Sequence, residues 1–352
     1  MRRPPSARYL WRRIDWGAVL NWAIWPLALG ALAPINTWDW PAYAGLSGLV
    51  VLYTRIRARG KRGVLPGLAI SVALAGGSYL LYSGFFRYYT PIFVGLGWSL
   101  GRTHTDFGEF LTMWGFVLFG AVSLLGALLV GLRARARNPI SRLLRTARLV
   151  LRYPLRLNRL EELWVLVSRQ EGKIERASSG IGRRLFVVGL VILVALVAWW
   201  AFRGYWVLVL MVPLLGLAAA LAVQPRWSDE QRYLLFLTFT GFLILVGVEF
   251  FYLKDHLDGD QQGWWRMNTL FKFYLQVWVM LGVAVGVSLP GLWRAVGRQA
   301  QRRPLGAWAW RTVLSLLVFA AALYPLLGTP ARVMDRFPGE RPAWGTLDGM
   351  AF

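Results

Sequence analysis

The stretch that decides the fold is residues 269–290, TLFKFYLQVWVMLGVAVGVSLP, in which Lys272 is the single charged side chain. A helix needs about 20 apolar residues to cross about 30 Å of hydrocarbon, and this run is long enough. Continuous Leu, Val, Ala and Gly favour a helix over the alternating pattern of a membrane strand. Comparable runs occupy residues 17–35, 38–54, 64–86, 109–132, 185–202, 205–223, 233–253 and 309–327. The sequence therefore predicts an all-α, polytopic transmembrane helix bundle with about nine spans.

Arginine is concentrated in every second gap between these runs, which predicts the orientation of the bundle. Lys and Arg near span ends favour the cytoplasmic side. The Arg-bearing segments are the N-terminus and residues 55–63, 133–184, 224–232 and 294–303. We therefore predict a cytoplasmic N-terminus and a C-terminus outside, in a multi-pass protein of the cell (inner) membrane.

The same pattern divides the chain into four parts. Residues 1–132 hold the first four spans, with a re-entrant outer segment near 90–101, where Pro91, Gly95, Gly97 and Gly101 interrupt a moderately apolar stretch. Residues 133–184 form a basic cytoplasmic linker whose apolar positions recur near helical spacing, which predicts an amphipathic interfacial helix. A solvated linker is the alternative. Residues 185–328 hold the last five spans, and 329–352 form an extracytoplasmic tail.

Composition limits the classes of function and partner. The net charge of +23 lies in membrane-proximal loops, so we expect membrane lipid, including anionic lipid of the inner leaflet, as the partner rather than nucleic acid. The chain has no cysteine, which excludes disulfides, thiolate metal sites and thiol redox chemistry.

The cluster richest in candidate functional residues runs from an outer loop into the span at 269–290. Arg266 and Lys272 lie near the N-terminus of this span, where free N–H groups and the positive end of the helix dipole favour an anion. A cation inside a span is costly and is normally retained because it meets something anionic. We therefore predict that Arg266 and Lys272 bind a phosphate or pyrophosphate headgroup, with Asn268 as a further candidate contact. A structural ion pair between Lys272 and Glu249 is an equal alternative, since the spans at 233–253 and 269–290 form a hairpin and we expect both residues at similar depth.

Two other outer segments carry polar candidates. Before the span at 109–132 lie Arg102, a further candidate for binding the phosphate, and His104 and Asp106, candidates for acid–base catalysis. Capping of the following helix is the favoured explanation of Asp106. Asp39 lies between two tryptophans in the turn at 36–41; it is a candidate general base, although capping is again favoured.

An acidic loop raises the question of a metal ion. Asp255, His256, Asp258 and Asp260 have the residue types of a hard-cation site, but their spacing matches no ion-binding loop, and Asp-Gly is ordinary turn chemistry. We expect no metal site and no cofactor, with a divalent cation as the alternative.

Three motifs resemble the YYY family of uncharacterised multi-span bacterial and archaeal membrane proteins. They are Asn36-Thr37-Trp38-Asp39-Trp40-Pro41, Arg266-Met267-Asn268-Thr269-Leu270-Phe271-Lys272-Phe273-Tyr274 and Leu347-Asp348-Gly349-Met350-Ala351. That family is similar to the C-type glycosyltransferases, which take a sugar from a polyprenyl-phosphate carrier at the outer face of the membrane. The resemblance implies that Arg266 and Lys272 contact the carrier phosphate and that Asn36, Asp39, Asn268 and Tyr274 line or brace the cavity.

The resemblance also sets expectations about completeness and function. Family members are longer, with an earlier hydrophobic half and a continuation beyond the tail, so a second chain supplying the missing half is an expected partner. We expect a glycosyltransferase-like protein acting on a polyprenyl-phosphate-linked sugar, with Glu249, Asn36, Tyr274 and Asp260 supporting the site. The alternatives are a transporter or lipid flippase, whose ionisable residues would lie at the bilayer midplane, and a non-catalytic membrane subunit.

Overall fold

The computed structural model describes residues 16–91, 95–102, 104–133, 179–224, 226–259, 264–301 and 304–336. The expected amphipathic helix of the 133–184 linker and most of the tail lie outside these residues.

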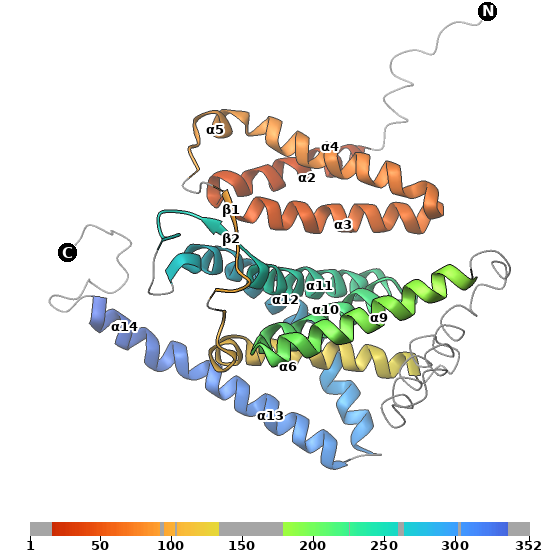
Figure 1. The fold of residues 1–352 in the computed structure, drawn as a ribbon, viewed down its shortest axis with the longest axis vertical. Helices are drawn as coiled ribbons and strands as arrows, with labels where there is room; N and C mark the ends of the chain where they lie inside the picture. The colour runs from red at the N-terminus through yellow and green to blue at the C-terminus, as the bar shows by residue number, and fades with distance from the viewer. Residues whose placement is uncertain are drawn as a thin grey trace, which may run out of the picture.

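The N-terminal part of the chain forms a layer of helices along one side of the molecule (Figure 1). Its elements are α2 (Trp16–Ile35), α3 (Asp39–Arg59), the 3-10 turn η1 (Gly60–Gly63), α4 (Val64–Leu81) and α5 (Ser83–Tyr88). The turn between α3 and α4 is tight because Gly60 has a φ of 59°, which side chains other than glycine rarely adopt.

The remaining helices form the rest of the molecule, on one side of this layer (Figure 1). They are α6 (Phe107–Arg133), α9 (Ser179–Phe202), α10 (Trp206–Ala222), α11 (Asp229–Phe250), the 3-10 turn η2 (Trp264–Arg266), α12 (Met267–Ala300), α13 (Pro304–Leu323), the π-helical segment η3 (Tyr324–Gly328) and α14 (Thr329–Arg336). The first residues of the expected tail are therefore helical.

Each predicted span overlaps a helix, although 64–86 is divided between α4 and α5 and 233–253 ends in a strand. The prediction of an α-helical membrane protein is confirmed. Within the described ranges, five helical stretches are long and apolar enough to cross a membrane. One of them, Asp39–Leu81, contains both α3 and α4, and three shorter apolar helices lie elsewhere. The number of spans and the sides of the two termini stay predictions.

A small sheet adds to the helices, which the all-α prediction did not include. Strand β1 (Gly95–Trp98) pairs antiparallel with β2 (Phe251–Lys254), and Gly97 lies opposite Tyr252. The segment predicted to be re-entrant thus includes a strand whose backbone groups are paired by the residues that follow α11. A Cβ on Gly97 would overlap the Tyr252 ring, so glycine lets this ring lie against the neighbouring strand.

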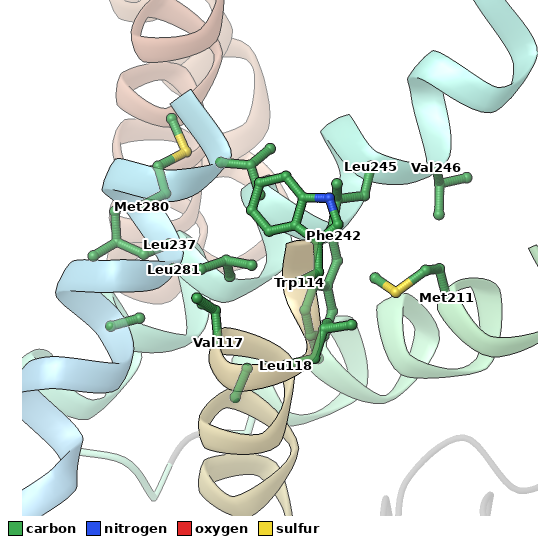
Figure 2. Packing of buried hydrophobic residues seen from close by; sticks show 14 of the residues in the cluster. Trp114, Val117, Leu118, Met211, Leu237, Phe242, Leu245, Val246, Met280 and Leu281 are labelled. Atoms are coloured by element: carbon green, nitrogen blue, oxygen red, sulfur yellow. The ribbon is translucent and has the colours of Figure 1, made fainter. Parts of the chain in front are cut away.

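The apolar core lies between α6, α10, α11 and α12. Figure 2 shows Trp114 of α6 among Met211, Phe242, Leu245 and Leu281, which come from the other three helices. All five side chains are buried. This core holds α11 and α12 together as the helices that carry the candidate site.

Two glycines allow the core helices to approach closely, as small residues do in membrane bundles. A Cβ on Gly120 of α6 would overlap Val285 of α12, and one on Gly241 of α11 would lie 2.9 Å from Leu281 of α12.

We expect Gly120→Ala to destabilise the protein by about 1–3 kcal/mol, the usual cost of overpacking a core. Val285 is β-branched and stiff, so it cannot easily move aside. Gly126→Ala on the same helix is the control, because a Cβ there meets nothing within 4 Å. Unfolding of both variants in detergent should show a lower free energy of unfolding for Gly120→Ala and no loss for Gly126→Ala. An equal response at both positions would contradict this explanation.

Candidate functional site

The three predicted outer segments converge on the beginning of α12. The ring of Trp38, before α3, lies 5.8 Å from that of Phe273 in an edge-on contact. Thr105, before α6, accepts a hydrogen bond from Arg266, and the Leu253 amide of β2 donates to the Thr269 hydroxyl. Residues far apart in sequence are therefore gathered at one end of the bundle, where they form separate polar clusters.

The first cluster surrounds Arg266, which is only 6% exposed. Its guanidinium lies 3.3 Å from the Glu249 carboxylate, 2.9 Å from the Thr105 hydroxyl and 3.4 Å from the Val248 carbonyl oxygen. Thr105 in turn donates to Glu249 through both its hydroxyl and its amide. Both terminal nitrogens of Arg266 are thus bound within the protein, and the cluster connects α11, α12 and the segment before α6.

This geometry rules out the alternative of an ion pair between Glu249 and Lys272, because Glu249 pairs with Arg266. Glu249 lies in the last turn of α11 and Arg266 is the residue before α12, so both are at the same level of the hairpin. Lys272 lies about 9 Å further along α12, at 1.5 Å per residue. Its ammonium lies over the Trp38 ring, 5.1 Å from the centroid. In the described part of the chain, Lys272 has no acidic partner within 4.0 Å.

The second cluster surrounds Asp39, the first residue of α3. Its Oδ1 accepts a hydrogen bond of 2.6 Å from the Asn36 amide and another from the Gln276 amide. No described residue donates to its second oxygen, Oδ2. Gln276 follows Lys272 by one helical turn, so Lys272 and Asp39 lie on the same side of α12. The Arg266 cluster is about 15 Å away along this helix, given ten residues at 1.5 Å each.

A third cluster joins the β-sheet to the loop after it. Asp258 accepts a hydrogen bond from the Tyr252 hydroxyl and pairs with Arg102 at 3.3 Å. The hydrogen bond from Tyr252, with Lys254 and Arg102 nearby, lowers the pKa of Asp258 below its usual range. The Arg102 guanidinium also lies over the rings of Tyr252 and Trp265, at 5.2 and 5.1 Å. Arg102 is thus held by partners within the protein.

The other predicted site residues occupy supporting positions. Asn268 donates a 2.7 Å hydrogen bond to Asp255, which also accepts from the Leu257 amide. The ring of His104 is exposed and lies 4.3 Å from that of Tyr205. Asp106 accepts a 2.9 Å hydrogen bond from the Glu109 amide, which confirms that it caps α6.

Tyr274 is buried beside the Arg266 cluster. Its ring meets the ring of Trp114 edge-on at 5.1 Å, and neither the hydroxyl nor the indole nitrogen has a hydrogen-bond partner in the described residues.

The acidic loop does not assemble a metal site from the residues that the structure describes, where no three His, Asp or Glu side chains gather. Asp260, one of the predicted support residues, lies outside the described residues.

The structure also adds residues that the sequence analysis did not select. Gln276 is 2% exposed and binds Asp39; a lone amide inside an apolar span was a signal that could have revealed it. Tyr252 and Thr105 complete the other two clusters, but ordinary strand and loop composition gave no reason to choose them.

These helices and polar clusters define a polytopic membrane protein with its ionisable residues gathered at the helix ends and in the connecting segments. The chain belongs to the family described as "Uncharacterized membrane protein (DUF2298)", which matches residues 6–281. The prediction of an uncharacterised membrane protein family is thereby confirmed. No curated protein and no solved structure matches the chain.

Proposed function

We propose that the protein is a glycosyltransferase-like enzyme that takes a sugar from a polyprenyl-phosphate carrier at the outer face of the cell membrane. The observation that carries the proposal is an apolar pocket of about 400 Å³ between α3, α11 and α12. Pro41 and Phe273 line this pocket, and they lie two residues after Asp39 and directly after Lys272.

Each part of this arrangement suits one part of the substrate. The pocket is lined almost entirely by apolar side chains and fits a segment of an isoprenoid chain: Pro41, Ala42, Gly45, Leu49, Phe239, Thr240, Leu243, Ile244 and Phe273. The ammonium of Lys272 has no acidic partner in the described residues, so an anionic phosphate would complete its environment. The structure therefore favours Lys272 over Arg266 as the direct phosphate contact.

The carboxylate of Asp39 is the proposed general base. Asn36 and Gln276 hold it through Oδ1, which leaves Oδ2 to accept a proton from an acceptor hydroxyl. The acceptor oxygen then bonds to the anomeric carbon, and the bond from that carbon to the phosphate oxygen breaks. The polyprenyl phosphate leaves with the electron pair, and Lys272 offsets its charge.

The remaining candidates have secondary roles in this proposal. Arg266 and Glu249 fix the start of α12, from which Lys272 and Gln276 project, while Asn268, Tyr274 and Arg102 stabilise the surrounding segments. His104 and Asp106 lie before α6, beside the Arg266 cluster and away from Asp39.

We expect purified protein in lipid nanodiscs to release polyprenyl phosphate from a polyprenyl-phosphate sugar when an acceptor alcohol is present. Lys272→Gln should lower this turnover by about 10-fold or more, the scale of losing one charge contact to a phosphate. Lys61→Gln is the matched control, because Lys61 lies at the opposite end of α3, in η1.

Two other outcomes of this experiment would contradict the proposal and indicate a different function. Sugar-lipid movement between leaflets of a vesicle without turnover would indicate a transporter or flippase. Neither turnover nor movement, with and without added divalent cation, would indicate a non-catalytic membrane subunit.

A further inference from the structure

A second pocket, with charged residues in its lining, lies at the other end of α3 and α11. It has a volume of about 510 Å³ and is lined by Val50, Tyr53, Thr54, Arg57, Ala58, Asp229, Arg232, Tyr233 and Phe236. Arg57 follows Asp39 by 18 residues, so this pocket is about 27 Å along α3 from the proposed catalytic carboxylate. The predicted orientation places it at the cytoplasmic face, where anionic lipid headgroups lie.

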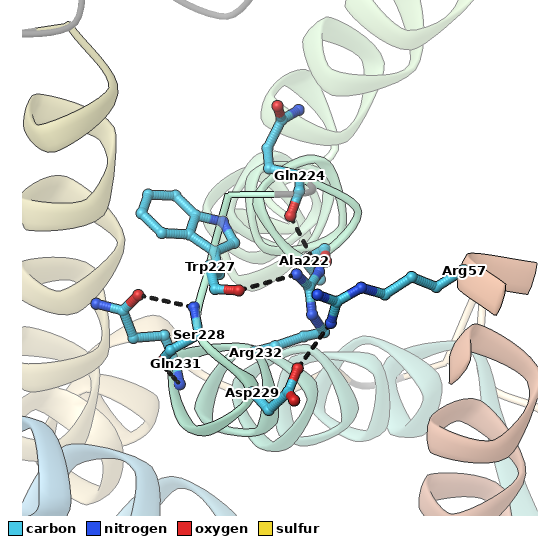
Figure 3. A network of polar contacts seen from close by, with 8 residues as sticks. All are labelled: Arg57, Ala222, Gln224, Trp227, Ser228, Asp229, Gln231 and Arg232. Carbon is cyan, nitrogen blue, oxygen red and sulfur yellow. Dashed lines mark hydrogen bonds and ion pairs between the residues drawn. The ribbon is translucent and has the colours of Figure 1, made fainter.

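Arg232 supplies a buried positive charge to this pocket. The residue is 3% exposed and donates to the carbonyl oxygens of Ala222, Gln224 and Trp227 at 2.9, 3.0 and 3.1 Å (Figure 3). Its guanidinium also lies 4.5 Å from the centroid of the Tyr53 ring. All these partners are neutral, and its Nε has no hydrogen-bond partner in the described residues. In the described residues, no acidic side chain lies within 4.0 Å of the Arg232 guanidinium, and Asp229 is the acidic residue that lines the same pocket.

Arg57 adds a second cation at the rim. It pairs with Asp229 at 2.7 Å, but both side chains are largely exposed, so this contact can exchange at low cost (Figure 3). The two arginines and the single aspartate give the pocket a net positive charge, which suits an anion.

The other walls of the pocket suit a hydrocarbon chain. Val50 and Phe236 line its apolar side, and the next pocket along the same pair of helices begins at Leu49 and Phe239. A ligand with a phosphate and an attached acyl chain would therefore contact both surfaces. We propose that the pocket between α3 and α11 at Arg57 and Arg232 binds the phosphate of an anionic phospholipid of the inner leaflet.

The test is a lipid titration of the purified, delipidated protein, read as the rise in its unfolding temperature. Short-chain phosphatidylglycerol should stabilise the protein more than phosphatidylcholine of the same chain length. Arg57→Gln should weaken the apparent affinity for phosphatidylglycerol by about fivefold, the contribution of one arginine near an anionic headgroup. Arg59→Gln, which removes the same charge from an exposed position outside the pocket, should leave the affinity unchanged.

Asp229→Asn should change the affinity for phosphatidylglycerol in the opposite direction to Arg57→Gln. It removes the carboxylate that competes for Arg57, so phosphatidylglycerol should bind more tightly to this variant than to the unaltered protein. The proposal is overturned if Arg57→Gln and Arg59→Gln weaken binding equally, which would indicate diffuse charge attraction. It is also overturned if inorganic phosphate stabilises the protein as well as the lipid does, because the ligand would then be a free ion.

Discussion

Glu249→Leu is expected to lower the free energy of unfolding by about 3–5 kcal/mol, because it leaves Arg266 charged and buried without a counter-ion. Glu249 is 3% exposed and is the acidic partner of Arg266 in the described structure. The substitution also removes the acceptor for Thr105, so the segment before α6 loses its contact with α11. Titration with SDS, followed by tryptophan fluorescence, measures the loss.

A double variant separates the cost of an unpaired charge from the value of the pair. Glu249→Leu combined with Arg266→Met removes both charges, and most of the lost stability should return, since apolar replacements of buried ion pairs are often neutral. Asp258→Asn, which breaks the more exposed pair with Arg102, is the comparison and should cost much less. If Glu249→Leu were no more damaging than Asp258→Asn, the Arg266 cluster would not hold the helices together.

Asp39→Asn is expected to reduce the proposed glycosyl transfer by about 10²- to 10⁴-fold, the usual contribution of a general base. The asparagine side chain has the same shape and keeps an oxygen that can accept from Asn36 and Gln276. Folding and binding of the donor lipid should therefore change little. Initial rates measured at several donor concentrations would show a lower kcat with a nearly constant KM.

The control for this experiment is Asp335→Asn, which makes the same chemical change at an exposed position of α14 and should retain turnover. If Asp39→Asn retained turnover, Asp39 would not be the base. Another carboxylate near α12 would then be the general base. The phosphate contact of Lys272 would still be tested separately by Lys272→Gln.

Several features of the fold could be predicted because they depend only on local composition. Apolar length predicted where the helices lie, since a backbone in hydrocarbon must satisfy its own hydrogen bonds. The capping role of Asp106 also followed from its position just before an apolar run, because a cap is made with amides only a few residues away. The gathering of three loops at one end of the bundle followed from the alternation of Arg-rich and Arg-poor gaps.

Partner choice at the site could not be predicted in the same way. The alternative in which Glu249 pairs with Lys272 was wrong, because β2 and η2 lie between α11 and α12 and bring Arg266 to the level of Glu249. The strand β1 was missed for a related reason: its pairing partner, β2, lies more than 150 residues further along the chain.

The sequence by itself determined that this is a helical membrane protein with polar groups gathered at its helix ends, because hydrophobicity and charge act on each segment separately. Only the tertiary structure decided that Arg266 is an internal ion-pair partner, while Lys272 lies over the Trp38 ring and has no acidic partner within 4.0 Å in the described residues. The physical reason is that ion pairs and hydrogen bonds depend on separations of a few ångströms, and these are set by how helices from distant parts of the chain pack against α12.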